Sequence, residues 1–166
     1  DQSITTGLAI SSDDAASWAS IPIELPGGFG IADRTDVAAL GESAPASWVA
    51  VATYARDGRS ALTLLRLDEG EFRVTGGLAG AFADASTTAM IGGEVVALEG
   101  GNIWRSTDGG QSWAPAALGA RGAPVGVWFA SPDVGAVEMQ DSTGAFELLV
   151  TSDGGVTWVT VLQTTP

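Results

Sequence analysis

The side chains of this chain that could carry chemistry are carboxylates, arginines and a single tyrosine. The 166 residues include twenty acidic residues and seven arginines, but no histidine, cysteine or lysine. The chain therefore lacks the usual general base, the usual zinc ligands and the Ser-His-Asp and Cys-His arrangements of nucleophilic catalysis. The chemistry still open to the chain is acid–base catalysis by carboxylates and bidentate binding of carboxylate or sulfate groups by arginine. The net charge of −13 disfavours nucleic acid and anionic membrane surfaces as partners.

Two short motifs could suggest bound ions, and other features explain both. Asp13 and Asp14 are adjacent carboxylates, but the Asp-x-Asp-x-Asp-Gly loop of a calcium site is absent. The paired glycines at 92–93 and 100–101 precede no helix, and no lysine is available, so we read them as hairpin turns rather than phosphate loops. We therefore expect no metal ion and no cofactor.

A motif of eight residues occurs twice in the chain, in two closely similar copies. Residues 106–113 read Ser-Thr-Asp-Gly-Gly-Gln-Ser-Trp, and residues 151–158, which start 45 positions later, read Thr-Ser-Asp-Gly-Gly-Val-Thr-Trp. A worn copy at 11–18 keeps a hydroxyl, a carboxylate and the tryptophan, and a more degraded one at 67–72 keeps Asp-x-Gly followed by an aromatic residue. The chain is therefore predicted to be a repeat protein.

The residue types of this motif suit a tight turn that a tryptophan closes. The aspartate can accept backbone N–H bonds within the turn, and glycine allows a positive φ without strain. The tryptophan starts the returning strand, and its indole N–H needs a hydrogen-bond partner. We expect these structural roles for Ser11, Asp13 and Trp18; for Asp68 and Gly70; for Ser106, Asp108, Gly110 and Trp113; and for Thr151, Asp153, Gly155 and Trp158.

Alternating hydrophobicity and turn signals predict short strands grouped in fours. Full units span about 35–76, 86–117 and 124–163, and residues 1–24 supply only the third and fourth strands of another unit. Helical periodicity is missing, and only residues 35–41 could pass for a helix. We therefore predict an all-β fold of β-propeller blades, with a β-sandwich as the alternative. Because three and a half blades cannot close a ring, we expect that further blades or a second copy of the chain complete it, or that the first unit packs in another way.

The pattern Ser/Thr-x-Asp-x-Gly-x-Ser/Thr-Trp resembles the Asp box, or bacterial neuraminidase repeat, and the copies at 106–113 and 151–158 match it fully. Residues 127–137 resemble blades of photosystem II assembly factors and related exported bacterial propellers. The resemblance covers nearly all of residues 1–166. It implies one propeller domain of a secreted, periplasmic or cell-surface bacterial protein. In that family the boxes join the third and fourth strands on the side opposite the usual ligand face.

This placement assigns the arginines to a candidate ligand face. The blade-to-blade connections and the second-to-third-strand loops contain four of the seven arginines, namely Arg34, Arg56, Arg59 and Arg121. Such a cluster suits carboxylate or sulfate groups, with ordinary solvated loop charge as the alternative. The same loops contain Asp33, Asp57, Asp84 and Asp141.

A glycoside hydrolase is one hypothesis, because sialidases and xyloglucan-cleaving endoglucanases carry Asp boxes. A sialidase needs three arginines, an acid/base aspartate and a Tyr–Glu nucleophile pair, for which the candidates here are Asp33, Tyr54 and Glu138. The sialidase Phe/Tyr-Arg-Ile-Pro motif is matched only poorly, at residues 72–75. A glycosidase also needs two carboxylates roughly 5–10 Å apart, a distance that a sequence does not define.

The favoured interpretation is a noncatalytic exported binding or scaffold module that holds a protein or glycan partner on a propeller face. A glycoside hydrolase and a purely structural domain are the alternatives. Trp48, Trp104 and Trp128 are expected to pack between blades, with a sugar-stacking platform as the other possibility. No apolar run approaches the roughly 18 residues that span a bilayer, so membrane insertion is not expected.

Overall fold

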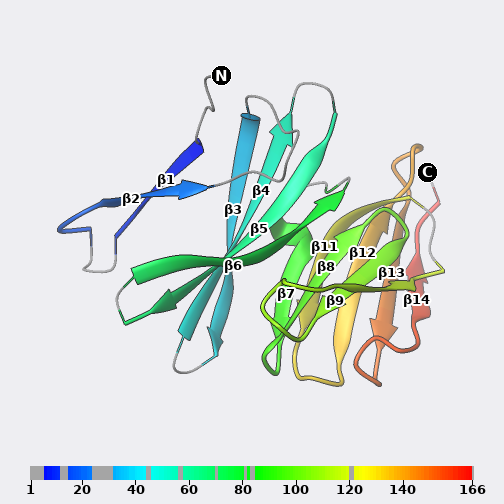
Figure 1. Ribbon diagram of the computed structural model, residues 1–166. Helices are drawn as coiled ribbons and strands as arrows, with labels where there is room; N and C mark the ends of the chain where they lie inside the picture. The colour runs from blue at the N-terminus through cyan, green and yellow to red at the C-terminus, as the bar shows by residue number, and fades with distance from the viewer. Residues whose placement is uncertain are drawn as a thin grey trace.

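The computed structural model describes residues 6–11, 15–23, 32–43, 46–55, 58–69, 71–80, 82, 85–119 and 122–165. Over these residues the protein consists of one β-hairpin, three four-stranded antiparallel sheets and a short 3-10 turn (Figure 1). The predicted all-β class is confirmed.

The strands follow one another along the chain within every sheet. The hairpin consists of β1 (Thr6–Ile10) and β2 (Ala19–Ile23). The first sheet consists of β3 (Ala32–Ser43), β4 (Ala46–Ala55), β5 (Ser60–Asp68) and β6 (Glu71–Gly80). After the turn η1 (Ala85–Thr87), the middle sheet consists of β7 (Thr88–Ile91), β8 (Glu94–Glu99), β9 (Asn102–Ser106) and β10 (Ala114–Ala117). The last sheet consists of β11 (Ala123–Phe129), β12 (Gly135–Gln140), β13 (Phe146–Thr151) and β14 (Val159–Gln163).

Turn glycines and cross-strand pairing explain where these strands begin and end. Glycines at positive φ form the tight turns between strands, as at Gly92 and Gly93 between β7 and β8 (φ 55° and 93°). The segment 35–41, the one stretch with some helical character, lies within β3, because its residues pair with β4 from Thr35 opposite Thr53 to Ala39 opposite Val49.

Strand β8 of the middle sheet is buried on both faces. Along β8, Val95 and Ala97 pack toward the first sheet, in a cluster with its Leu62 and Leu64. The alternate residues Val96 and Leu98 pack toward the last sheet, in a cluster with Val137, Met139 and Leu149. Because side chains alternate along a strand, one sheet thus connects two hydrophobic cores.

The tryptophans on strands divide between these cores and the surface. Trp48 is buried and Trp104 half-buried, and both belong to the core between the first and middle sheets. The Trp104 Nε1–H donates to Glu99 at 2.9 Å. Trp128 in the last sheet is 52% exposed, so it does not pack between described sheets as the sequence led us to expect.

The sheets meet along their first strands. Strand β7 contacts both β3 and β11, and η1 also contacts β3, β4 and β11. The fourth strands β6, β10 and β14 each form the opposite edge of their sheet.

This packing predicts the cost of a cavity between the middle and last sheets. Leu98 is completely buried there, so Leu98→Ala should lower the free energy of unfolding by about 2–5 kcal/mol. Val156→Ala, at a side chain that is 77% exposed, is the matched control and should change it little. Urea unfolding of the unaltered chain and the two variants tests this, and equal midpoints for all three would contradict the burial of Leu98 between the middle and last sheets.

Candidate functional site

The two complete boxes form loops at one end of the middle and last sheets. In loop 106–113, Ser106 Oγ accepts the Gly110 N–H at 2.7 Å and donates to Asp108 Oδ1 at 2.8 Å. Asp108 Oδ1 also accepts the N–H groups of Gln111 and Ser112 at 3.0 and 2.9 Å, and Asp108 Oδ2 accepts the Ser112 hydroxyl at 2.6 Å. The carboxylate thus ties the loop to itself.

Loop 151–158 repeats this arrangement. Thr151 Oγ1 accepts the Gly155 N–H at 2.7 Å and donates to Asp153 Oδ1 at 2.8 Å. Asp153 accepts the Thr157 N–H at 2.9 Å and its hydroxyl at 2.6 Å. In both boxes the aspartate and the first hydroxyl therefore form hydrogen bonds within their own loop.

These hydrogen bonds favour the ionised carboxylates. Bonds from Ser112, then from Ser106 and Gln111, lower the pKa of Asp108 to about 2. Bonds from Thr157, then from Thr151 and Val156, lower the pKa of Asp153 to about 2. Carboxylates that stay ionised at neutral pH in this way cannot serve there as general acids.

Loop 106–113 also fastens the middle sheet to the first. The Gly77 N–H donates to the Gly110 carbonyl at 3.0 Å, and Trp113 Nε1–H donates to the Gly77 carbonyl at 2.9 Å. A side chain at Gly76 would overlap the Gly110 backbone. The Gly76–Gly77 pair was not among the residues predicted to matter, although adjacent glycines within a strand indicate a close backbone approach.

Loop 151–158 contacts the middle sheet in a different way. Trp158 belongs to the core between the middle and last sheets and meets Phe129 edge-on at 6.2 Å. A Cβ at Gly155 would lie 2.9 Å from the guanidinium of Arg105 in β9. The Trp158 Nε1–H donates within its own loop, to the Gly155 carbonyl at 3.1 Å.

The degenerate copy of the box at 11–18 retains one hydrogen bond of the complete boxes. The Ala15 N–H donates to Ser11 Oγ at 2.8 Å, the bond that Gly110 and Gly155 make in the complete boxes. Ala15 has a φ of 66°, which a glycine would adopt with less strain. Asp13 lies outside the described residues. Trp18 is 64% exposed, unlike the half-buried Trp113 and Trp158.

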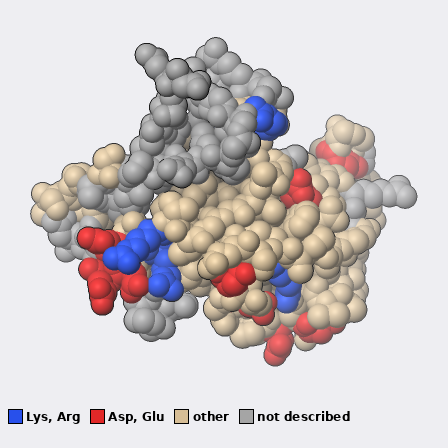
Figure 2. All heavy atoms as spheres, in the orientation of Figure 1, with Lys and Arg blue, Asp and Glu red and all other residues tan. Residues whose placement is uncertain are grey.

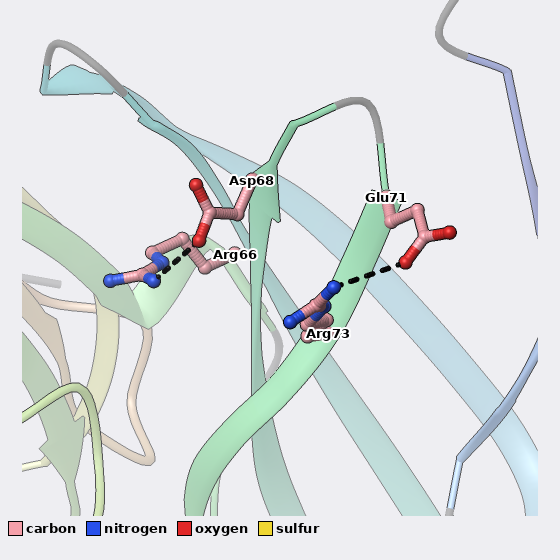
Figure 3. A network of polar contacts seen from close by, with 4 residues as sticks. All are labelled: Arg66, Asp68, Glu71 and Arg73. Atoms are coloured by element: carbon pink, nitrogen blue, oxygen red, sulfur yellow. Dashed lines mark hydrogen bonds and ion pairs between the residues drawn. The ribbon is translucent and has the colours of Figure 1, made fainter.

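Asp68 has a different role from the one expected of a degraded box. Strands β5 and β6 stay paired as far as Asp68 opposite Glu71, so Asp68 belongs to the strand ladder and not to a box loop. Figure 3 shows that Asp68 bonds Arg66 of its own strand, at 2.9 Å, and that Arg73 bonds Glu71, at 3.2 Å. Gly70 lies outside the described residues.

The other end of the sheets, opposite the box loops, is here called the far end. Arg34 lies there, with a side chain that is 59% exposed; it bonds Asp36 at 2.6 Å, and its guanidinium lies 4.3 Å over the Tyr54 ring. Hydrogen bonds to Asp36 and then to Tyr54 raise the pKa of Arg34 above its ordinary value. This arginine is thus held by its own sheet.

The remaining arginine and aspartate candidates are only partly described. Arg59 is exposed, directly before β5. Asp33 lies in β3, but its side chain is outside the description. Arg56, Arg121, Asp57 and Asp84 lie outside the described residues.

The structure does not bring Tyr54 and Glu138 together as a nucleophile pair. Glu138 lies in the last sheet, opposite Gly126 and Leu148, while its neighbours Val137 and Met139 face the middle sheet. Because side chains alternate along a strand, Glu138 faces away from the other sheets. Tyr54 belongs to the first sheet, and the middle sheet separates the two residues.

A pocket of about 310 Å³ opens at the far end of the last sheet. The carboxylates of Asp141 and Glu147 and the amide of Gln163 line it. The other lining residues are Gly119, Ala145 and Phe146.

Both carboxylates of the pocket are held in place. Asp141 Oδ1 accepts the N–H groups of Thr143 and Ala145 at 2.8 and 3.0 Å and the Thr143 hydroxyl at 2.6 Å. These bonds, chiefly from Thr143, lower the pKa of Asp141. Glu147 Oε1 accepts the Thr160 hydroxyl at 2.6 Å. Asp141 was expected on the ligand face. Glu147 and Gln163, which lie opposite each other in β13 and β14, were not predicted as site residues.

Charge and ligand geometry limit the other chemistries within the described part of the chain. On the face shown in Figure 2, basic side chains lie mostly beside acidic ones, with no broad basic patch over the described surface. No group of three or more acidic residues there is arranged to hold a metal ion. Among the helices of the described residues, none has the length and apolar character of a membrane span.

Comparison with known proteins adds no assignment. No protein-family model matches the chain, and no curated protein matches it either.

The box carboxylates predict how stability depends on pH. Because the folded pKa of Asp108 is about 2, below the ordinary value of 3.8, its stabilising effect is complete above about pH 4 and is lost as pH falls toward 2. Asp108→Asn should therefore lower stability at pH 7, and the deficit should shrink between about pH 4 and pH 2. Urea midpoints across this range test it, with Glu71→Gln as a control of equal charge change. A deficit that is the same at every pH would contradict this role.

The unequal contacts of the two box tryptophans predict unequal losses. Trp113→Phe removes a donor that bonds both Gly77 and Gly110, whereas Trp158→Phe removes a bond only within its own loop. The first substitution should cost about 1 kcal/mol more than the second. Thermal and urea unfolding of both variants measure this difference, and equal losses would argue against the fastening role of Trp113.

Proposed function

We propose that the chain is a noncatalytic binding module, built from propeller-type blades, that holds a glycan at the far end of its last sheet. The pocket formed by Asp141, Glu147 and Gln163 carries this proposal. Carboxylate and amide groups match sugar hydroxyls, because carboxylates accept and amides both accept and donate hydrogen bonds.

The size and rigidity of the pocket support a small ligand. Its volume of about 310 Å³ lies at the lower end of ordinary ligand sites, roughly 300–1,000 Å³, which suits one sugar unit at the end of a chain. The bonds to Asp141 and Glu147 fix both carboxylates before a ligand arrives. Such preorganisation reduces the entropic cost of binding.

The blade assignment rests on the boxes and on the order of the strands. Each four-stranded sheet is a meander, and both complete boxes join a third strand to a fourth, as in the Asp-box family. The boxes and the pocket lie at opposite ends of the last sheet, as the ligand-face expectation requires. The same resemblance underlies the proposal that the module works outside a bacterial cell.

Two observations favour binding over hydrolysis. Hydrogen bonds lower the pKa of Asp141, so this carboxyl group does not match the protonated acid that a glycosidase uses near neutral pH. The sialidase-type pair is also not assembled, because Tyr54 and Glu138 lie in different sheets.

Saturation-transfer NMR with a panel of neutral and acidic methyl glycosides tests the proposal. We expect weak binding of at least one sugar, reduced tenfold or more by Glu147→Gln and by Gln163→Ala but unchanged by Glu71→Gln at the opposite end. Absence of binding across the panel, or binding that both pocket variants leave intact, would refute it. Hydrolysis of aryl glycosides would refute its noncatalytic part.

A further inference from the structure

The last sheet exposes one apolar face, here called the outward face. Its register places Trp128, Ala136, Val150 and Val159 in one row across the four strands. Glu138, Leu148 and Leu162 form a second row on the same face. Trp128 is 52% exposed, Val159 62% and Leu162 56%. A face of this kind usually marks an interaction surface.

The outward face repeats a surface that is already an interface elsewhere in the chain. Leu148 precedes the box at 151 by three residues, as Ile103 precedes the box at 106. Ile103 is completely buried in the core between the middle and last sheets. By this repeat, the outward face of the last sheet is shaped to receive the next unit of the same kind.

The hairpin β1–β2 has the features of half of such a unit. Ile10, directly before its box, pairs with Ala19 directly after it. Arg105 and Ala114 pair in the same way around the box at 106–113, and Val150 and Val159 around the box at 151–158. The hairpin is therefore the third and fourth strands of a further unit.

The box tryptophan of this hairpin lacks the contact that the others make. Trp113 and Trp158 pack into the cores that join their sheets to the preceding ones, whereas Trp18 is 64% exposed. Among the described elements, β1 and β2 make their main contacts with each other. Figure 1 shows the hairpin and β14 at opposite sides of the molecule, so Trp18 cannot reach the outward face of its own chain.

We infer that the hairpin β1–β2 of one copy docks on the outward face of the last sheet of a second copy, with Trp18 covering Trp128, Val159 and Leu162. The charges fit this contact in a chain of net charge −13, because β1 and β2 contain no charged residue and Glu138 is the one charged residue of the outward rows. The contact joins two different surfaces head to tail, so two copies can close a ring or many can form a filament. It does not depend on the sugar pocket.

Light scattering on a dilution series, with paired variants, tests this inference. The unaltered chain should form dimers or larger assemblies, and both Trp18→Asp and Leu162→Asp should reduce it to monomers. An equimolar mixture of the two variants should recover a one-to-one complex, because each variant keeps the surface that the other has lost. Val156→Asp, at an exposed position of the last box, is the matched control and should assemble normally.

Three results would overturn the inference. The first is an unaltered chain that stays monomeric throughout the series. The second is a Trp18→Asp variant that assembles as well as the unaltered chain, which would indicate a symmetric contact between two outward faces. The third is a mixture that stays monomeric. Circular dichroism shows that each variant is folded, and unchanged sugar binding by Trp18→Asp separates this test from that of the proposed function.

Discussion

The burial of strand β8, in the middle sheet, on both of its faces is the constraint on which the rest of the structure depends. Strand β8 sends Val95 and Ala97 into one core and Val96 and Leu98 into the other, and all four residues are completely buried. A chain with no cysteine gains no disulfide, so hydrophobic burial is the main term that opposes chain entropy. Loss of either neighbouring sheet would expose two of these four residues to water.

The box loops make this stacking specific. Hydrophobic faces alone allow sheets to slide, because the hydrophobic effect has no preferred direction. The bonds between Gly77 and Gly110 and from Trp113 to Gly77 fix the first and middle sheets in one alignment. Loop 151–158 has the corresponding internal hydrogen bonds. Its neighbour in the middle sheet is the Arg105 guanidinium instead of a glycine pair. One local motif thus serves two different inter-sheet contacts, and its polar groups are used for architecture.

Features that depend on neighbours in sequence could be predicted, and features that depend on distant segments could not. The strands around the boxes followed from alternation, and the turn chemistry of Asp108 and Asp153 from the spacing of their partners within four residues. The bond from Trp113 to Gly77 joins residues 36 positions apart, and no local pattern indicated it. Asp68 resembled a box residue, but cross-strand pairing with Glu71 took precedence. The pocket joins Gly119 to Glu147 and Gln163, a grouping that only the folded chain defines.

Residue-resolved native-state hydrogen exchange tests the central claim most directly. If the middle sheet is the common support of both cores, the amides of β8 and the Gly77 N–H should exchange only through global unfolding, and the amides of β1 and β14 through local opening. Exchange of β8 amides as fast as those of β14 would contradict the account, because it would mean that the sheets open independently of one another.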